Sequence, residues 1–563
     1  MAEQRIRMAK HGKPKGRMVD PQALAEVRAA LGAALPARDL LIEHLHAIQD
    51  RYGHLSAAHL AALAADMKLS QVEVFEVASF YHHFDVVREG GTPPPALTVR
   101  VCQSLSCAMA GSDALIEALK AGLGDGLRVQ PVPCVGRCQE APVAVVGRNP
   151  LARATLPAVQ QAIAGGATEA AMPEAIGLAQ YQADGGYQLY RDCRAGRHTP
   201  ESLIATMENA GLRGLGGAGF PVGRKWRIVA DQPAPRYLAV NIDEGEPGTF
   251  KDRHYLESDP QRFLEGMLIA AWAVDVAAIY IYLRDEYAGC RHLLQREISL
   301  LQAAGLPKLP AIHLRRGAGA YICGEESAMI ESLEGKRGLP RLRPPFVAEV
   351  GLFGLPTLEQ NMESLFWVRD IVSQGPDWFA AQGRNGRSGL RSFSVSGRVK
   401  QPGVHLAPAG ITVRQLIAEY CDGMADGHDF YGYFPGGASG GMLPASLGDL
   451  PLDFDTLNPY GCFIGSAAII VFSQHDRARD LALNAMRFFE HESCGQCTPC
   501  RVGTAKAAGL MAQAEWDRPL LDELAAVMSD ASICGLGQAA PNPLRCAIKY
   551  FPQEFAGQPG ELP

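Results

Sequence analysis

Three closely spaced cysteines near the C-terminus constrain this chain more than any other feature of its sequence. Cys494, Cys497 and Cys500 follow a C-x2-C-x2-C spacing within "ESCGQCTPCRVGT". Three thiolates on one short loop are typical of a cubane [4Fe–4S] cluster, whose irons need soft anionic ligands from one side. The spacing therefore predicts an electron carrier with a fourth ligand elsewhere in the chain.

Two later cysteines compete to be that fourth ligand. Cys534 lies in "DASICGLGQ", and Cys546 follows it. We favour Cys534, because the adjacent Gly535 and Gly537 let backbone amides approach the cluster sulfurs. Residues 476–563 are then predicted to form a helical [4Fe–4S] domain.

A second set of cysteines occurs in the first third of the chain. Cys102 and Cys107 are spaced C-x4-C, and Cys134 and Cys138 are spaced C-x3-C. Two thiolate pairs on loops at strand ends can hold a [2Fe–2S] cluster. The alternative is a zinc site, although such sites favour C-x2-C knuckles. A redox dithiol is disfavoured, because no C-x2-C occurs here.

Composition excludes several other classes of protein. A net charge of −7 argues against a general nucleic-acid binder. No apolar run approaches the roughly 18 residues needed for a membrane span, and the N-terminus lacks the apolar core of a signal peptide. Without a secretion signal, the 14 cysteines indicate metal ligands and buried thiols rather than disulfides. We expect a cytoplasmic protein with no membrane span.

The 563 residues are enough for about four domains. The basic residues 1–20 predict a flexible solvated tail, or alternatively an arm that docks on an acidic partner. The other predicted segments are a helical lead-in over 21–95, the [2Fe–2S] domain over 96–165, a linker over 166–189, an α/β domain over 190–380 and a β-rich domain over 385–475.

A glycine-dense run, "GLRGLGGAGFPVGRKW", opens the α/β domain. Gly214, Gly216 and Gly219 match G-x-G-x-x-G, but a helix precedes them rather than the strand that a dinucleotide turn requires. Glycines still permit close backbone approach and free N–H groups for a phosphate, and Lys225 adds a cation. The alternative is a tight turn between packed elements.

An acidic loop follows the first predicted strand of that domain. "VNIDEGEPGTFKDR" carries Asn241, Asp243, Glu244 and Glu246, which could hydrogen-bond a flavin ring and its ribityl hydroxyls. The alternative is a solvated surface loop. Further along, the glycines of "RRGAGAYICGEES" open a helix, which suits an anion, while Cys323 there is more typical of core packing.

Taken together, these motifs resemble the FMN-binding, NADH-oxidising subunit of respiratory complex I and its soluble relatives. The first cysteine set, with "LIEHLHAIQDRYGHL" and "SFYHHF" upstream, resembles the small [2Fe–2S] subunit that accompanies it. Both are fused here, as in soluble NAD-dependent formate dehydrogenases and NAD-reducing hydrogenases. The sequence motifs are most similar to those of the β subunit of a molybdenum or tungsten formate dehydrogenase.

The resemblance implies a multidomain α/β fold, with a thioredoxin-like [2Fe–2S] domain, a Rossmann-like FMN domain, a ubiquitin-like β-grasp domain and a C-terminal helical [4Fe–4S] domain. It also implies the cofactor contacts. For FMN these are Gly214, Gly216, Gly217, Lys225, Asn241, Asp243, Glu244, Tyr282 and Asn361. For NAD(H) they are Phe220, Lys225, Glu246, Glu286 and Glu326.

Two positions depart from the family pattern. Leu215 stands where many relatives have arginine, which leaves a phosphate site dominated by backbone groups. Gln360 precedes Asn361 where relatives often have an asparagine pair, so the resemblance leaves open whether Gln360 contacts the flavin.

The function implied is that of a diaphorase subunit in a hetero-oligomer. A partner α subunit with molybdenum or tungsten and further clusters would oxidise formate, and electrons would cross the iron–sulfur centres to FMN, which reduces NAD+. No catalytic residue is needed beyond FMN, with Glu246 nearby. The alternatives are a hydrogenase or complex I diaphorase, and a non-catalytic zinc scaffold, which visible absorption would distinguish.

Overall fold

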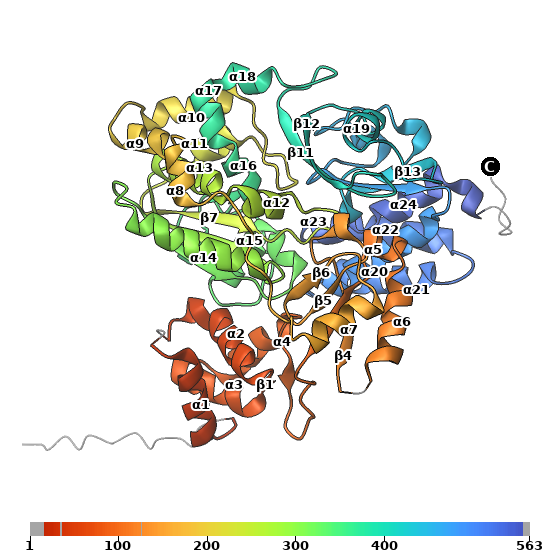
Figure 1. Ribbon diagram of the computed structural model, residues 1–563, viewed down its shortest axis with the longest axis horizontal. Helices are drawn as coiled ribbons and strands as arrows, with labels where there is room; N and C mark the ends of the chain where they lie inside the picture. Colours follow the sequence, from red (N-terminus) through yellow and green to blue (C-terminus); the bar gives the residue numbers. More distant parts are fainter. Residues whose placement is uncertain (1–15, 34–35, 125, 556–563) are drawn as a thin grey trace, which may run out of the picture. The chain divides into compact units, whose positions relative to one another are not determined.

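The computed structural model describes residues 16–33, 36–124 and 126–555, whose helices and strands are labelled in Figure 1. The chain divides into two compact units. The first extends to Pro94 and includes Gly335–Arg337, and the second contains everything else. Most of the predicted tail over 1–20 lies outside the described residues.

The first unit is the predicted helical lead-in. Leu41, Leu45 and Ile48 on its second helix are fully buried, and their spacing is that of one face of a helix. Asp20 caps the first helix by accepting a hydrogen bond from the Gln22 backbone N–H at 2.9 Å. The elements are α1 (Pro21–Leu31), α2 (Leu41–Tyr52), β1 (Leu55–Ser56), α3 (Ala57–Met67), α4 (Gln71–Phe80) and β2 (Val86–Val87).

The second unit begins with the thioredoxin-like domain. Its four-stranded sheet has the order β4-β3-β5-β6, with β3 and β4 parallel and the other pairs antiparallel. Val99, Val101 and Leu119 lie in its core. The elements are β3 (Thr98–Cys102), α5 (Leu105–Met109), α6 (Ser112–Leu123), β4 (Arg128–Val132), β5 (Ala144–Val146), β6 (Asn149–Leu151) and α7 (Leu156–Ala164).

A parallel four-stranded sheet of order β10-β7-β8-β9 forms the centre of the next domain. The two central strands, β7 and β8, supply buried apolar side chains, as expected where helices cover both faces, whereas the edge strands β9 and β10 carry several polar residues. The strands are β7 (Arg236–Ile242), β8 (Val276–Leu283), β9 (Ala311–Arg316) and β10 (Thr357–Asn361). The acidic loop directly follows β7, as expected from the sequence.

Helices connect and cover these strands (Figure 1). They are α10 (Pro200–Asn209), α11 (Val222–Ala230), α12 (Lys251–Ser258), α13 (Pro260–Ala273), α14 (Ala288–Ala303), α15 (Glu326–Leu333), α16 (Met362–Phe366), α17 (Val368–Gln374) and α18 (Pro376–Ala380).

The predicted linker over 166–189 differs from the structure in its second half. This part contains α8 (Leu178–Ala183) and the start of α9 (Gln188–Arg194). Tyr181 and Tyr187 are buried there, and their hydroxyls donate to Glu265 at 2.7 Å and to Gln261 at 2.6 Å. The segment is rich in Ala and Gly, but its few large side chains anchor it in the core of the central domain.

The β-rich domain is a mixed five-stranded sheet of order β12-β11-β15-β13-β14 with one helix, which is a β-grasp arrangement. The strand β11 pairs with β12 in antiparallel fashion and with β15 in parallel. The elements are β11 (Leu390–Gly397), β12 (Gly403–Pro408), α19 (Val413–Tyr420), β13 (Phe430–Phe434), β14 (Leu443–Pro444) and β15 (Ala468–Ser473).

The C-terminal region is helical, as predicted. It contains α20 (Ala478–Glu492), α21 (Thr498–Met511), α22 (Arg518–Ala531), α23 (Gly535–Ala539) and α24 (Asn542–Tyr550). No helix in the described part of the chain is both long and apolar enough to cross a membrane.

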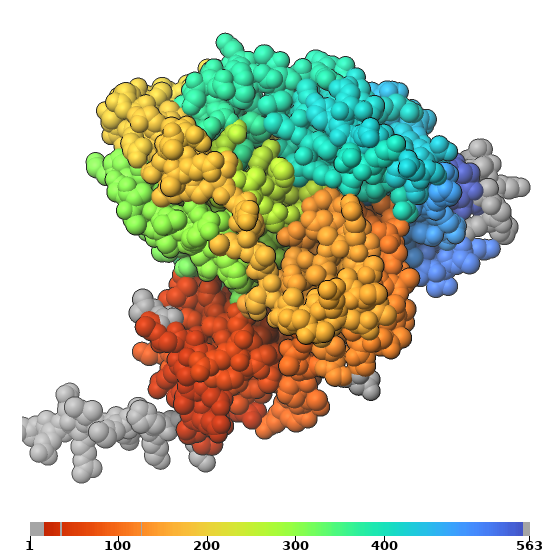
Figure 2. Space-filling view, in the orientation of Figure 1, coloured from red at the N-terminus to blue at the C-terminus, as the bar shows by residue number. Residues whose placement is uncertain are grey.

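The domains of the second unit pack against one another. In Figure 2 the orange thioredoxin-like domain adjoins the cyan β-grasp domain. Ser106 Oγ lies 2.9 Å from Ser396 Oγ, and Arg398 Nη2 donates to the Met109 carbonyl at 2.8 Å. The two cysteine sets are thus held within one folded unit.

Candidate functional site

A cavity of about 860 Å³ lies at the carboxyl edge of the parallel sheet. Asn361 is the last residue of β10, and Asn241 and Tyr282 are the last but one of β7 and β8; the three are in register with one another. Ligands of open α/β sheets bind at this edge, and the volume is typical of a cofactor site. All but two of the predicted cofactor-binding residues line the cavity, namely Gly214, Gly216, Gly217, Phe220, Lys225, Asn241, Asp243, Glu244, Glu246, Glu326 and Asn361.

The glycine-rich loop between α10 and α11 forms one wall of this cavity. Its ends are joined by a bridge between Arg213 and Pro221. A Cβ at Gly216 would lie 3.0 Å from the Asn361 Cβ, so only glycine fits without displacement. Leu215 is buried, and its backbone N–H donates to Ser364 Oγ at 2.9 Å. Gly214, Gly216 and Gly217 line the cavity and have no side chains, so the loop presents backbone groups to it, which suits a phosphate.

Lys225 on α11 is the cation that accompanies this loop. Its Nζ lies 3.1 Å from Glu359 Oε2 and 3.8 Å from Glu326 Oε2. Burial alone would lower the Lys225 pKa, but the two carboxylates raise it above its usual range. The amino group thus stays charged and is available to an anionic ligand.

Asp243 in the acidic loop has a buried carboxylate oxygen, Oδ2, without a hydrogen-bond partner among the described residues. Burial raises the pKa of Asp243 well above its usual range, while Arg284 opposes that rise. An unpaired buried oxygen is costly. A flavin carries N–H and hydroxyl donors that could satisfy it, so the acidic loop fits FMN.

Glu244 faces inward and is held by several donors. It accepts the backbone N–H groups of Asp252 at 2.8 Å and Arg253 at 3.2 Å, and the Tyr287 hydroxyl at 2.8 Å. Burial, followed by the nearby Asp252 charge, raises the Glu244 pKa to about 7. These contacts fix the conformation of the loop at the cavity wall.

Glu246 connects the acidic loop to another part of the central domain and to the β-grasp domain. It accepts a hydrogen bond from the Tyr321 hydroxyl and two from Ser439, through the backbone N–H at 2.8 Å and the hydroxyl at 3.0 Å. Burial raises the Glu246 pKa to about 7, although these donors oppose it. Glu246 is therefore a group that titrates near neutral pH inside the cavity.

We expect Glu246→Gln to flatten the pH dependence of NAD+ affinity. Above its raised pKa the carboxylate is charged and attracts the cationic nicotinamide of NAD+, but not the neutral ring of NADH. Wild-type affinity for NAD+ should rise several-fold between about pH 6 and 8, while that for NADH stays nearly constant. Isothermal titration with both nucleotides measures this, and an unchanged slope in the variant would refute the assignment.

Several cavity residues were not predicted. Lys251 is almost fully buried, with Nζ 2.8 Å from Asp252 Oδ1 and 3.1 Å from Glu363 Oε2. Asn361 Nδ2 donates to Asp252 Oδ2 at 2.7 Å. Lys251 and Asp252 belong to the "GTFKDR" motif, so a signal was present. Ser439 and Ser466 come from the distant β-grasp domain, and no local pattern marks them.

Two predicted contacts do not line the cavity. Tyr282 is buried, and its hydroxyl lies 3.0 Å from Ser332 Oγ on α15. Glu286 pairs with Arg284 through an Nη2–Oε1 distance of 2.6 Å. Conversely Gln360, which does not match the family pattern, is buried and lines the cavity.

The first cysteine set converges at one buried point of the thioredoxin-like domain. Cys102, Cys107, Cys134 and Cys138 are each at most 5% exposed, and the sulfurs of Cys134 and Cys138 are 3.3 Å apart. The Gly136 backbone N–H donates to Cys134 Sγ at 3.4 Å. Four thiols without a histidine in this arrangement suit a [2Fe–2S] cluster.

The second set also comes together. Cys494, Cys497, Cys500 and Cys534 line one small cavity, with Ile322 and Leu536 among its apolar walls. Burial raises the pKa of Cys500 to about 11 and that of Cys534 to about 12. Both must lose protons to bind iron, so cluster insertion is coupled to proton release.

Local structure explains how these cysteines are presented. Cys497 and Cys534 are the residues that precede α21 and α23, and backbone N–H groups of Leu536 and Gly537 reach the Cys534 sulfur. Donors of this kind tune and stabilise an anionic cluster. Cys546 lies elsewhere, with its sulfur 3.5 Å from that of Cys462.

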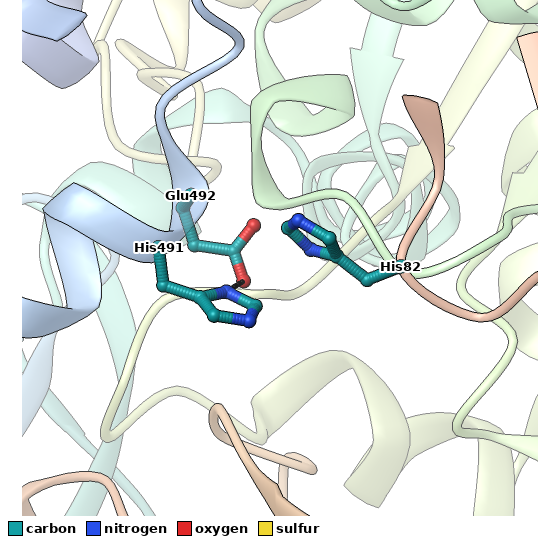
Figure 3. Close-up of side chains that lie close together, drawn as sticks. All are labelled: His82, His491 and Glu492. Carbon is teal, nitrogen blue, oxygen red and sulfur yellow. Dashed lines mark hydrogen bonds and ion pairs between the residues drawn. The ribbon is translucent and has the colours of Figure 1, made fainter. Parts of the chain in front are cut away.

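The end of α20 leads into the cluster loop. Figure 3 shows Glu492 and His491, whose Nδ1 lies 3.4 Å from Glu492 Oε1, and His82, which belongs to the first unit. Glu492 Oε2 accepts the Tyr321 backbone N–H at 3.0 Å. The cubane loop is thus tied to the residue that also holds Glu246.

Both cysteine sites adjoin the large cavity. Ile322 and Leu536 line the cavity of the second cysteine set and also the large one. In the first set, Cys134 and Cys138 pack against Phe250, whose neighbours Thr249 and Lys251 line the large cavity. Each cysteine set is therefore separated from the cavity by only a few side chains.

Three family models match this chain. The Nuo51 FMN-binding domain matches residues 207–370, and the iron–sulfur binding region of NADH-ubiquinone oxidoreductase F matches 480–558. The thioredoxin-like [2Fe–2S] ferredoxin model matches residues 29–166, a range that includes most of the helical lead-in. Fold and site together define an NAD(H)-dependent oxidoreductase subunit that carries FMN, a [2Fe–2S] cluster and a [4Fe–4S] cluster.

Two relatives of this chain support the same class of protein. The NADH-quinone oxidoreductase F 2 subunit of Rhizobium meliloti is 39% identical over 68% of this chain and 94% of the relative. The mitochondrial 51 kDa subunit of NADH-ubiquinone oxidoreductase of Neurospora crassa is 40% identical over 63% of this chain and 76% of the relative. The chain belongs to the family of the F and 51 kDa subunits of these oxidoreductases.

A solved structure matches almost the whole chain. A chain from the crystal structure of NAD+-reducing [NiFe]-hydrogenase in the H2-reduced state superimposes with a TM-score of 0.82 at 32% identity. The match covers 94% of each chain. This similarity therefore extends over a larger share of the present chain than the similarity to the F 2 subunit does.

Proposed function

We propose that this chain is the diaphorase subunit of an NAD+-reducing complex whose partner subunit oxidises a small substrate at its own metal centre. The observation that carries this proposal is the cavity flanked by two cysteine quartets within one folded unit. When bound there, FMN exchanges hydride with the nicotinamide and single electrons with the clusters.

The chain's residues then have distinct tasks. The glycine-rich loop and Lys225 hold a phosphate, and Asp243 offers its unpaired oxygen to a donor of the flavin. Glu246, positioned by Tyr321 and Ser439, sets the charge where the nicotinamide would lie. The apolar walls Ile322 and Leu536 exclude water between the cavity and the [4Fe–4S] ligands.

The partner's substrate distinguishes two versions of this proposal. The full-length similarity to the chain of an NAD+-reducing [NiFe]-hydrogenase favours hydrogen oxidation at a nickel-containing partner. The resemblance of the motifs to formate dehydrogenase β subunits favours formate oxidation at molybdenum or tungsten. We place hydrogen first, because the structural match extends over both cluster domains.

Metal analysis of the native complex separates these versions. Copurification with a nickel protein supports the hydrogenase version, and molybdenum or tungsten supports the formate version. A complex that holds none of these metals and reduces quinone with NADH would contradict both. The measurement is inductively coupled plasma mass spectrometry of the affinity-purified assembly.

The isolated chain should oxidise NADH with an artificial dye but should not use hydrogen or formate. The reason is that the NAD(H) and flavin site is complete within this chain, whereas the primary oxidation needs a centre that it does not provide. Steady-state assays with NADH, formate and hydrogen test this. Formate or hydrogen turnover by the chain alone, free of a partner, would overturn the proposal.

A further inference from the structure

Arg284 occupies a position that the proposed electron path does not explain. It directly follows β8, and its side chain is only 5% exposed. Its Nη2 donates to the carbonyl of Cys134 at 2.8 Å, and its Nη1 donates to the carbonyl of Glu244. One guanidinium thus joins the [2Fe–2S] ligand loop to the acidic loop of the flavin cavity.

The Arg284 guanidinium remains positively charged. Burial alone would lower the Arg284 pKa, but Glu286 raises it well above its usual range. Glu286 binds the guanidinium at two points, Nε–Oε2 at 3.1 Å and Nη2–Oε1 at 2.6 Å. The Tyr287 ring centroid lies 5.1 Å from the Arg284 Cζ. A permanent cation, partly balanced by one carboxylate, therefore lies beside the Cys134 backbone.

The same loop is anchored a second time. Arg253 Nε donates to the Gly136 carbonyl at 2.9 Å. Gly136 has a φ of +72°, and a Cβ there would lie 2.2 Å from the Tyr287 hydroxyl oxygen, which itself donates to Glu244. The [2Fe–2S] loop is thus held rigidly against the central domain even without Arg284.

We propose that Arg284 is a positioning residue that raises the reduction potential of the [2Fe–2S] cluster, with Glu286 moderating its effect. Reduction adds one electron to a cluster that four thiolates already make anionic. A cation held nearby in a low-dielectric interior stabilises the reduced form more than the oxidised form. This inference rests on the proposed function, with the four buried cysteines as the ligands of that cluster.

The proposal assigns Glu286 a role through Arg284 rather than through direct nucleotide contact. Removing the guanidinium charge and removing its counter-charge should shift the potential in opposite directions. A merely structural role predicts no such opposition, because both changes would only loosen the loop. The pair of variants therefore separates electrostatic tuning from loss of packing.

The test is a redox titration of the full chain in its native complex, with the [2Fe–2S] signal followed by electron paramagnetic resonance. Arg284→Met should reduce the ratio of reduced to oxidised cluster at fixed potential at least tenfold, which corresponds to a downward shift of about 59 mV for one electron. Glu286→Gln should raise the same ratio, and Arg284→Lys should stay nearer to wild type than Arg284→Met.

Arg227→Met is the matched control. This half-buried arginine on α11 pairs with Glu201 and Glu208, which belong to neither loop, so the potential should not move. Iron content and signal intensity are measured in every variant. If Arg284→Met loses the cluster, the upward shift in Glu286→Gln decides the question.

Equal potentials in all variants with full clusters, or shifts of the same sign in Arg284→Met and Glu286→Gln, would overturn the proposal. A wild-type chain that contains no [2Fe–2S] signal would instead refute the proposed function itself. The two failures are thus distinguishable from the same titration.

Discussion

Replacing Cys534 with serine should remove the four-iron centre and leave the two-iron centre intact. A serine hydroxyl is a hard ligand that holds its proton far more tightly than a thiol, so one corner of the cubane loses its bond. The four ligands line one small cavity, and no other cysteine of the described chain lines it. Iron should fall from about six to about two atoms per chain.

Iron and sulfide analysis and low-temperature electron paramagnetic resonance measure this change. Electron transfer between the partner and this chain should stop, whereas NADH oxidation with a dye should continue, because none of the four cysteines lines the flavin cavity. Cys546→Ser is the matched control, since that buried sulfur lies beside Cys462 and outside the cluster cavity. If Cys546→Ser lost the four-iron signal and Cys534→Ser kept it, Cys546 rather than Cys534 would be the fourth ligand.

The second large effect is expected from Gly216→Val. The added Cβ would lie 3.0 Å from the Asn361 Cβ, and the branched side chain would enter the space next to the phosphate-binding backbone. FMN affinity should fall at least 100-fold, which is about 2.7 kcal/mol. The measurements are flavin content of the purified protein and fluorescence titration of the apoprotein with FMN.

Gly509→Val serves as the control for this variant. Gly509 lies on α21, and a Cβ there meets no described atom within 4 Å. Its FMN content should equal that of the wild type. Full flavin occupancy and unchanged affinity in Gly216→Val would exclude the glycine-rich loop from the flavin site.

The sequence was most informative where chemistry depends on spacing. The first cysteine quartet and the C-x2-C-x2-C triplet were predicted from their intervals, and Cys534 from its flanking glycines. The structure brings each quartet together. Asn241 was expected at a strand end, and it is in register with Asn361 at the carboxyl edge of the sheet. Such features can be predicted from local sequence, because ligand spacing and strand ends depend on residues that are close together along the chain.

Other features depended on contacts between distant residues. Tyr282 lies at the carboxyl edge of the sheet, as expected, but its hydroxyl contacts Ser332. Glu286 forms an ion pair with Arg284. Ser439 reaches Glu246 from 193 positions away along the chain. No periodicity encodes such pairings, since they follow from how the β-grasp and central domains pack.

That packing has a practical consequence for protein engineering. The walls of the nucleotide cavity come from the central sheet, from Ser439 and Ser466 of the β-grasp domain, and from Gly535 and Leu536 beside the [4Fe–4S] ligands. A fragment trimmed to the flavin domain alone would expose the cavity to solvent on two sides. An engineered diaphorase fragment should therefore include all three of these segments.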